Sequence, residues 1–130
     1  MTVEEVVQRL EKALRERPAL ARVPITVIGN RVVTLGEALE MLRRGEHVEE
    51  VLRALETLGL SNEYEKLRLL AAEFFRRMPP HMRVMVLGGE TRALSGEELA
   101  EEILRGTELG KKLVEEFRSY LLTVRALLGG

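Results

Sequence analysis

Four glutamates crowd one short stretch of the chain, and carboxylates at this density can ligate a divalent cation. They are Glu97, Glu98, Glu101 and Glu102. No aspartate or amide lies nearby to complete a coordination shell. Acidic side chains are also favoured in the first turn of a helix, where the helix dipole is positive. We therefore expect these glutamates to face solvent at the start of a helix, and the sequence predicts no metal site.

Side chains suited to acid–base or nucleophilic catalysis are scarce. His47 and His81 are the only histidines, and neither a Glu-x-x-His nor a His-x-x-x-His spacing occurs. Cysteine is absent, which excludes disulfides, thiolate nucleophiles and cysteine metal sites. No serine lies in the context of a nucleophile elbow. The sequence therefore predicts that the protein is not an enzyme and uses no cofactor.

Two stretches of the chain are basic and free of acids, residues 17–36 and 74–89. Together with the segment that follows the second stretch, they supply the candidate anion-binding residues Arg22, Arg31, Arg76, Arg77, His81, Arg83 and Arg92. Arginine forks bind phosphate groups bidentately, so nucleic-acid or other polyanion binding is one hypothesis. The alternative is structural, because arginines near the end of a helix complement its dipole and pair with glutamates elsewhere.

The elements that would position these residues form a repeated pattern. In residues 25–45, two β-branched runs joined at Gly29-Asn30 predict a hairpin, and a helix follows that begins at a Thr34–Glu37 capping box and ends at a glycine. Residues 84–106 repeat this order, with a turn at Gly88-Gly89 and a second capping box. The two capping residues, Thr34 and Ser95, are 61 positions apart.

The same offset aligns the helices on either side of the hairpins, so the pattern predicts an internal repeat of residues 1–60 and 61–117. We expect one domain over residues 1–130, with the last helix extended to residue 128. The predicted fold class is α+β and mostly helical. It is built from two α–hairpin–α–α units related by a pseudo-twofold, whose four strands can either join in one small antiparallel sheet or stay apart.

Two helices of the second unit are more apolar than their counterparts. The helix expected over residues 61–78 is apolar nearly all round, which is typical of a buried central helix. The far half of the last helix has no counterpart in the first unit, so we predict a homodimer through this helix, with folding back over the central helix as the alternative. The candidate interface residues are Phe117, Tyr120, Leu121, Val124 and Leu128.

Composition narrows the class of protein. The formal net charge is −1, so no overall field attracts the chain to nucleic acid or membrane. No signal peptide or membrane-spanning run is evident, which favours a cytoplasmic protein with no membrane partner. All 21 acids are glutamate and 16 of the 20 basic residues are arginine, which favours a thermophile. We expect a small non-enzymatic protein-interaction module that self-associates, with polyanion binding as the alternative.

Overall fold

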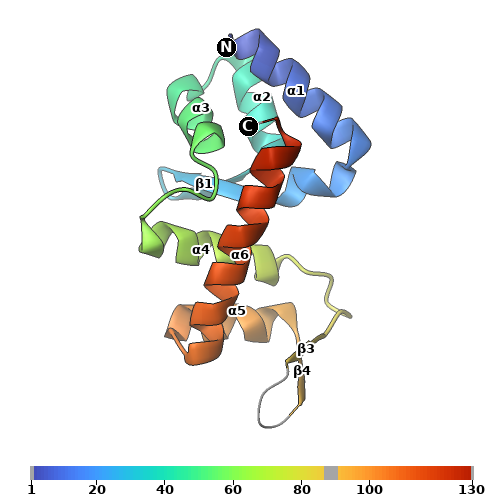
Figure 1. Ribbon diagram of the computed structural model, residues 1–130, viewed down its shortest axis with the longest axis vertical. Coiled ribbons are helices and arrows are strands. Elements are labelled where there is room, and N and C mark those ends of the chain that lie inside the picture. The colour runs from blue at the N-terminus through green and yellow to red at the C-terminus, as the bar shows by residue number, and fades with distance from the viewer. Residues whose placement is uncertain (1, 87–90, 130) are drawn as a thin grey trace.

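The computed structural model describes residues 2–86 and 91–129, which form six α-helices, one 3₁₀ helix and two hairpins (Figure 1). The first unit contains α1 (Val3–Glu16), the 3₁₀ helix η1 (Pro18–Arg22), β1 (Pro24–Ile28), β2 (Arg31–Thr34), α2 (Leu35–Arg44) and α3 (Val48–Glu56). The second unit contains α4 (Tyr64–Arg76), β3 (Val84–Val86), β4 (Arg92–Leu94), α5 (Gly96–Arg105) and α6 (Glu108–Leu127). The predicted fold class and the repeated order of elements are confirmed.

Both predicted capping boxes are present. Thr34 Oγ1 accepts a hydrogen bond from the backbone N–H of Glu37 at 3.3 Å, and Glu37 Oε1 accepts one from the N–H of Thr34 at 3.2 Å. Ser95 and Glu98 form the same pair of hydrogen bonds at 3.1 and 3.0 Å. A glycine in the left-handed conformation ends each of these helices, as predicted. These elements were predictable because the free backbone N–H and C=O groups at each helix end are hydrogen-bonded by residues only a few positions away.

The two hairpins form separate sheets in different surroundings. In the described residues β1 pairs with β2 and β3 pairs with β4, both antiparallel, so the alternative of one shared sheet is wrong. The first three residues of β1 are buried, and β1 packs against α3 and α4, which occupy the space that a shared sheet would need. The predicted turn at Gly29-Asn30 joins β1 to β2. The turn predicted at Gly88-Gly89 lies outside the described residues.

The helix α4 is central but is not buried all round. It packs against β1, α5 and α6, and its buried residues are Leu67, Leu70, Ala71 and Ala72. Leu69 is 47% exposed, so the expected burial of the whole helix is wrong. The helix also begins later than residue 61, because the Ser61 side chain accepts a hydrogen bond from the N–H of Glu63 and shapes a turn before it.

The long helix α6 connects the two units. Figure 1 shows it running along the molecule from α5, past α4, to the first unit, where both chain ends lie. Arg118 Nη1 donates a hydrogen bond to the carbonyl of Ser61 at 2.8 Å, and Arg125 Nε donates one to the carbonyl of Glu56 at 3.1 Å. The buried residues of both units and of α6 form one core cluster. The far half of α6 therefore folds back within the chain, which was the alternative to the predicted dimer helix.

Candidate binding site

The residues predicted to form a dimer interface lie mostly in the core. Phe117 and Leu121 are 2% exposed, and Val124 is fully buried. Tyr120 is 37% exposed and Leu128 is half-buried, so these two are still accessible. The interpretation that the apolar stripe outruns its own domain is wrong, because the first unit and α4 cover it. Self-association through this helix could use Tyr120 and Leu128 but not the three buried side chains.

The arginines between the end of α4 and the start of β3 are largely paired with glutamates. Arg76 Nη1 lies 3.2 Å from Glu73 Oε2, and its Nε lies 3.7 Å from Glu97 Oε1. Arg77 Nε lies 2.9 Å from Glu73 Oε1. Arg83 donates from Nη1 to the carbonyls of two residues of its own loop, at 2.8 and 2.9 Å. The guanidinium groups of Arg76, Arg77 and Arg83 therefore bind carboxylates and carbonyl groups of the chain itself.

The other predicted anion-binding residues are spread over the surface. Arg31 forms an ion pair with Glu37, the glutamate of the first capping box. Arg22, His81 and Arg92 are exposed, and the ion pairs of the described residues include none of the three. The structural alternative therefore explains most of the arginines near the hairpins, and polyanion binding would depend on Arg22, His81 and Arg92.

A pocket is present where the first unit meets the end of α6. It lies between α1, α3 and the C-terminal end of α6, and its volume is 390 Å³. The apolar lining consists of Val6, Leu10, Leu52, Leu55 and Leu128. The polar lining consists of Arg9, Glu56 and Arg125. Pockets of about 300–1,000 Å³ with apolar walls and a few polar groups are typical of sites for small ligands, so we take this pocket as the candidate binding site.

The two units differ in their aromatic packing. In the second unit the rings of Phe74, on α4, and Phe117, on α6, pack with their centroids 5.3 Å apart. At the offset of 61, the corresponding positions of the first unit hold Ala13 and Glu56. Ala13 does not line the pocket and Glu56 is exposed at its edge, so the ring pair of the second unit has no counterpart in the first unit. The sequence interpretation missed this pocket, because its lining comes from α1, α3 and the end of α6, which only the tertiary structure brings together.

Two arginines connect the rim of this pocket to its surroundings. Arg125 Nε donates to the Glu56 carbonyl, which lies at the end of α3. Arg9 Nη1 donates to the carbonyl of Gly129, just beyond the end of α6, at 3.4 Å. Both arginines therefore satisfy carbonyl groups at helix C-termini, where cations are favoured. In the described residues neither arginine forms an ion pair with Glu56, although all three side chains line the same pocket.

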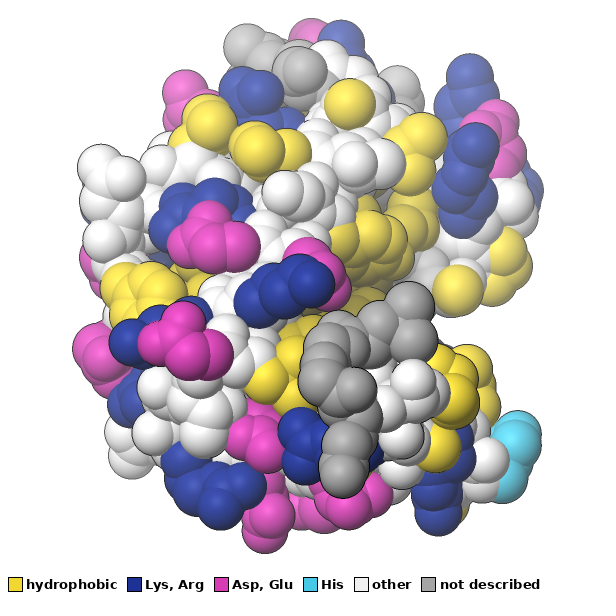
Figure 2. Space-filling view, turned by 60° about the horizontal axis from the view of Figure 1, so that its bottom comes forward, with side chains coloured by type: hydrophobic (Ala, Val, Ile, Leu, Met, Phe, Trp, Pro, Cys, Tyr) yellow, Lys and Arg dark blue, Asp and Glu magenta, His cyan; other side chains and the backbone are white. Residues whose placement is uncertain are grey.

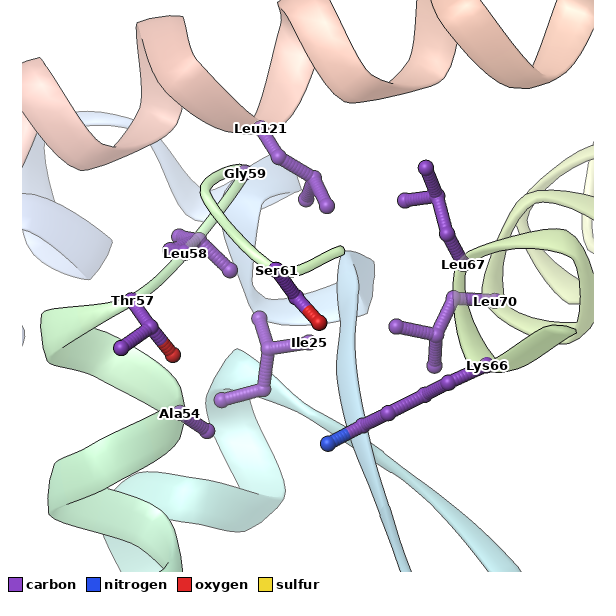
Figure 3. A pocket seen from close by; sticks show the side chains of 10 residues that line it. All are labelled: Ile25, Ala54, Thr57, Leu58, Gly59, Ser61, Lys66, Leu67, Leu70 and Leu121. Carbon is purple, nitrogen blue, oxygen red and sulfur yellow. The ribbon is translucent and has the colours of Figure 1, made fainter. Parts of the chain in front are cut away.

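A second cavity lies where the two units meet (Figure 3). It is enclosed by the end of α3, residues 57–61, β1, α4 and α6, and Lys66 extends across it from α4. Its volume is 30 Å³, which is room for about one water molecule. This cavity is too small for an organic ligand and is a feature of the packing between the units.

The hairpin of β3 and β4 exposes apolar side chains. Met82 is 45% exposed and Met85 is 60% exposed. Val84 and Val86, on either side of Met85, are half-buried and pack against the core. Figure 2 shows hydrophobic side chains gathered in a hollow on the face of the molecule that brings the second unit forward. This face therefore has the apolar surface that a protein-binding site needs.

The structure assembles no metal centre from the described residues. No three histidine or glutamate side chains in residues 2–86 and 91–129 lie close enough to hold an ion. Glu97 and Glu98 stand in the first turn of α5, as expected for a solvated helix start. Among the helices described, none has the length and apolar character needed to cross a membrane.

In comparisons with known proteins, no family model, no curated protein and no solved structure matches this chain.

Proposed function

We propose that the protein is a small non-enzymatic protein-interaction module that binds an extended segment of a partner along the β3–β4 hairpin. The observation that carries this proposal is the exposure of Met85. Of the large hydrophobic side chains in the described residues, it has the highest exposed fraction, 60%. Methionine is polarisable and flexible, and surfaces that accommodate partner side chains use it often.

The two hairpins of the repeat differ in a way that supports this role. The first hairpin is used internally, since β1 is buried and packs between α3 and α4. In the second hairpin, β4 has two exposed residues before the buried Leu94, and β3 is at most half-buried. Within the described residues neither β3 nor β4 pairs with a further strand. A strand of this kind has backbone N–H and C=O groups free to pair with an added strand.

The charges around the hairpin indicate the chemistry of the partner. The pKa of Glu98 lies below its ordinary value because the backbone N–H and hydroxyl of Ser95 hydrogen bond to it, and the positive charges of Arg83 and Arg92 add to this effect. His81 is also exposed on this segment. A partner segment with alternating apolar side chains and flanking carboxylates is therefore complementary to the hairpin in both shape and charge.

Binding of a defined peptide tests this proposal. The probe is a short peptide in which valine and threonine alternate between pairs of glutamates, and its matched control replaces the glutamates with lysines. We expect fluorescence anisotropy to show saturable binding of the acidic peptide and at least tenfold weaker binding of the basic one. Met85→Lys should weaken binding of the acidic peptide by about tenfold, which is the effect of losing one well-packed interface residue.

The control variant is Leu60→Lys, because Leu60 is 53% exposed and lies outside the hairpin. It should bind the acidic peptide as the wild type does. Equal losses in Met85→Lys and Leu60→Lys, or no binding of the acidic peptide by the wild type, would exclude the hairpin site. Light scattering on the same samples tests whether the partner is a second copy of this chain. In that case the wild type should be a dimer, and Met85→Lys should be a monomer because self-association through β3 is lost. Binding of duplex DNA that survives Met85→Lys but falls steeply with salt would favour polyanion binding instead.

A further inference from the structure

The pocket between α1, α3 and the end of α6 is separate from the hairpin face. Its apolar lining comes from three elements that are far apart in the sequence: Val6 and Leu10 on α1, Leu52 and Leu55 on α3, and Leu128 after α6. Leu10 is 1% exposed, and the other four are half-buried. Each methylene group that moves from water into such surroundings strengthens binding about fourfold. The apolar lining is therefore suited to an aliphatic chain.

The polar side of the pocket carries an excess of positive charge. Arg9 and Arg125 contribute two guanidinium groups, and Glu56 contributes one carboxylate. Arg125 uses Nε to hold the Glu56 carbonyl, and Arg9 uses Nη1 to hold the Gly129 carbonyl. Guanidinium groups have five N–H donors each, so both keep donors for a further oxygen. Paired arginines are well suited to a planar carboxylate.

Two features of the pocket oppose an anion. The ends of α3 and α6 are helix C-termini, where the helix dipole is negative. The hydrogen bonds from the two arginines offset these partial charges directly at the carbonyl groups. Among the lining residues that the structure describes, Glu56 carries the one negative side chain, so its charge should reduce the affinity for an anion. This opposition gives the site a specific signature, because removal of the Glu56 charge should tighten binding of an anion and leave a neutral ligand unaffected.

We propose that this pocket binds an amphipathic carboxylate, with its aliphatic chain between α1 and α3 and its carboxylate between Arg9 and Arg125. The ligand is a free monoanionic molecule with a single unbranched chain, which matches the apolar lining and the single excess positive charge. The proposal does not depend on the protein-interaction role of the hairpin.

Isothermal titration of the intact protein with decanoate and with decanol tests this proposal. The two probes share the chain and differ in the carboxylate. We expect decanoate to bind saturably, one molecule per chain, and at least tenfold more tightly than decanol. Arg9→Gln and Arg125→Gln should each weaken decanoate by about tenfold, because each removes a charge-assisted hydrogen bond. Glu56→Gln should tighten decanoate, and none of the three substitutions should change decanol binding.

The matched control is Arg15→Gln, since Arg15 is an exposed arginine on α1 that does not line the pocket. It should bind decanoate as the wild type does. Leu52→Trp should abolish binding of both probes by filling the pocket, with circular dichroism used to verify that the variant is folded. If it is not, Leu55→Phe takes its place. Met85→Lys should leave decanoate binding intact, so a failure of the hairpin proposal is distinguishable from a failure of this one.

Three results would overturn the carboxylate site. The first is the absence of saturable decanoate binding. The second is equal affinity for decanoate and decanol, which would mean that the pocket accepts any apolar chain. The third is a loss of decanoate affinity in Arg15→Gln as large as that in Arg9→Gln, which would mean that decanoate is attracted by the surface charge in general.

Discussion

Gly59 lies against Leu122 with no room for a side chain between them. A Cβ atom at Gly59 would lie 2.8 Å from Leu122 Cδ2 and 2.9 Å from the backbone nitrogen of Leu122. Gly59 belongs to the segment between α3 and α4, and Leu122 belongs to the far half of α6. The segment that links the two units is therefore held directly under the helix that returns over the first unit. Arg118 and Arg125 hold the same segment and the end of α3 from the same helix.

This close approach predicts the effect of alanine at position 59. Gly45→Ala is the matched control, because Gly45 has a similar positive φ but nothing within 4 Å of its ideal Cβ position. The left-handed conformation should cost Gly45→Ala about 1 kcal/mol of unfolding free energy. Gly59→Ala should lose about 1–3 kcal/mol more from the clash with α6. Urea denaturation of both variants measures the difference, and equal losses would mean that α6 does not press on this segment in solution.

The burial of the far half of α6 predicts that its apolar residues stabilise the monomer. Leu121→Ala should reduce the unfolding free energy by about 2–5 kcal/mol, as expected for a buried leucine. Leu127 is 40% exposed on the same helix, and Leu127→Ala should change stability by less than about 0.5 kcal/mol. Guanidinium denaturation at several protein concentrations provides the measurement. If the loss of unfolding free energy in Leu121→Ala depends on protein concentration, this residue stabilises a dimer instead.

The capping boxes predict matched effects in the two units. Thr34→Ala and Ser95→Ala should each lower the unfolding free energy by about 1 kcal/mol, because each leaves a backbone N–H of the first helical turn without its side-chain partner. Ser119 lies within α6, and Ser119→Ala should change stability by less than about 0.5 kcal/mol. Thermal and chemical denaturation measure these effects. A Ser95→Ala variant as stable as the wild type would mean that the second box contributes nothing in solution.

The pKa of Glu37 predicts acid sensitivity. Partial burial raises this pKa, but hydrogen bonds from Arg31 and Thr34 and the charge of Arg31 lower it by more, so it lies below its ordinary value. The ionised Glu37 carboxylate therefore stabilises the folded state. This contribution is fully present above the pKa of glutamate in the unfolded state, about 4.3. It is lost as the pH falls through the lower folded value.

Urea denaturation between neutral pH and pH 3 measures this loss, with Glu37→Gln as the comparison. The substitution removes the titrating group, so the wild type should lose its stability advantage over Glu37→Gln as the pH falls. An advantage that stays constant down to pH 3 would contradict the assignment.

The amino-acid sequence by itself determined the elements and their order. The capping boxes at Thr34 and Ser95, the turn at Gly29-Asn30 and the glycines that end α2 and α5 were predictable because each is satisfied by groups a few residues away. Apolar periodicity located the helices for the same reason. The arginines near the hairpins were identified correctly as a basic group, but their partners were not, since Arg76 also pairs with Glu97 on α5, 21 positions further along the chain.

The tertiary structure decided what these elements cover. Whether the stripe of Leu121 and Val124 meets another chain or the first unit depends on the path of residues 57–61 beneath α6, which local patterns do not encode. The two sheets stay apart because β1 is occupied by α3 and α4. The candidate pocket lies where α1, α3 and the end of α6 meet, and its two arginines come from α1 and α6. Such contacts join residues more than a hundred positions apart, as Arg9 and Gly129 show, so only the folded chain reveals them.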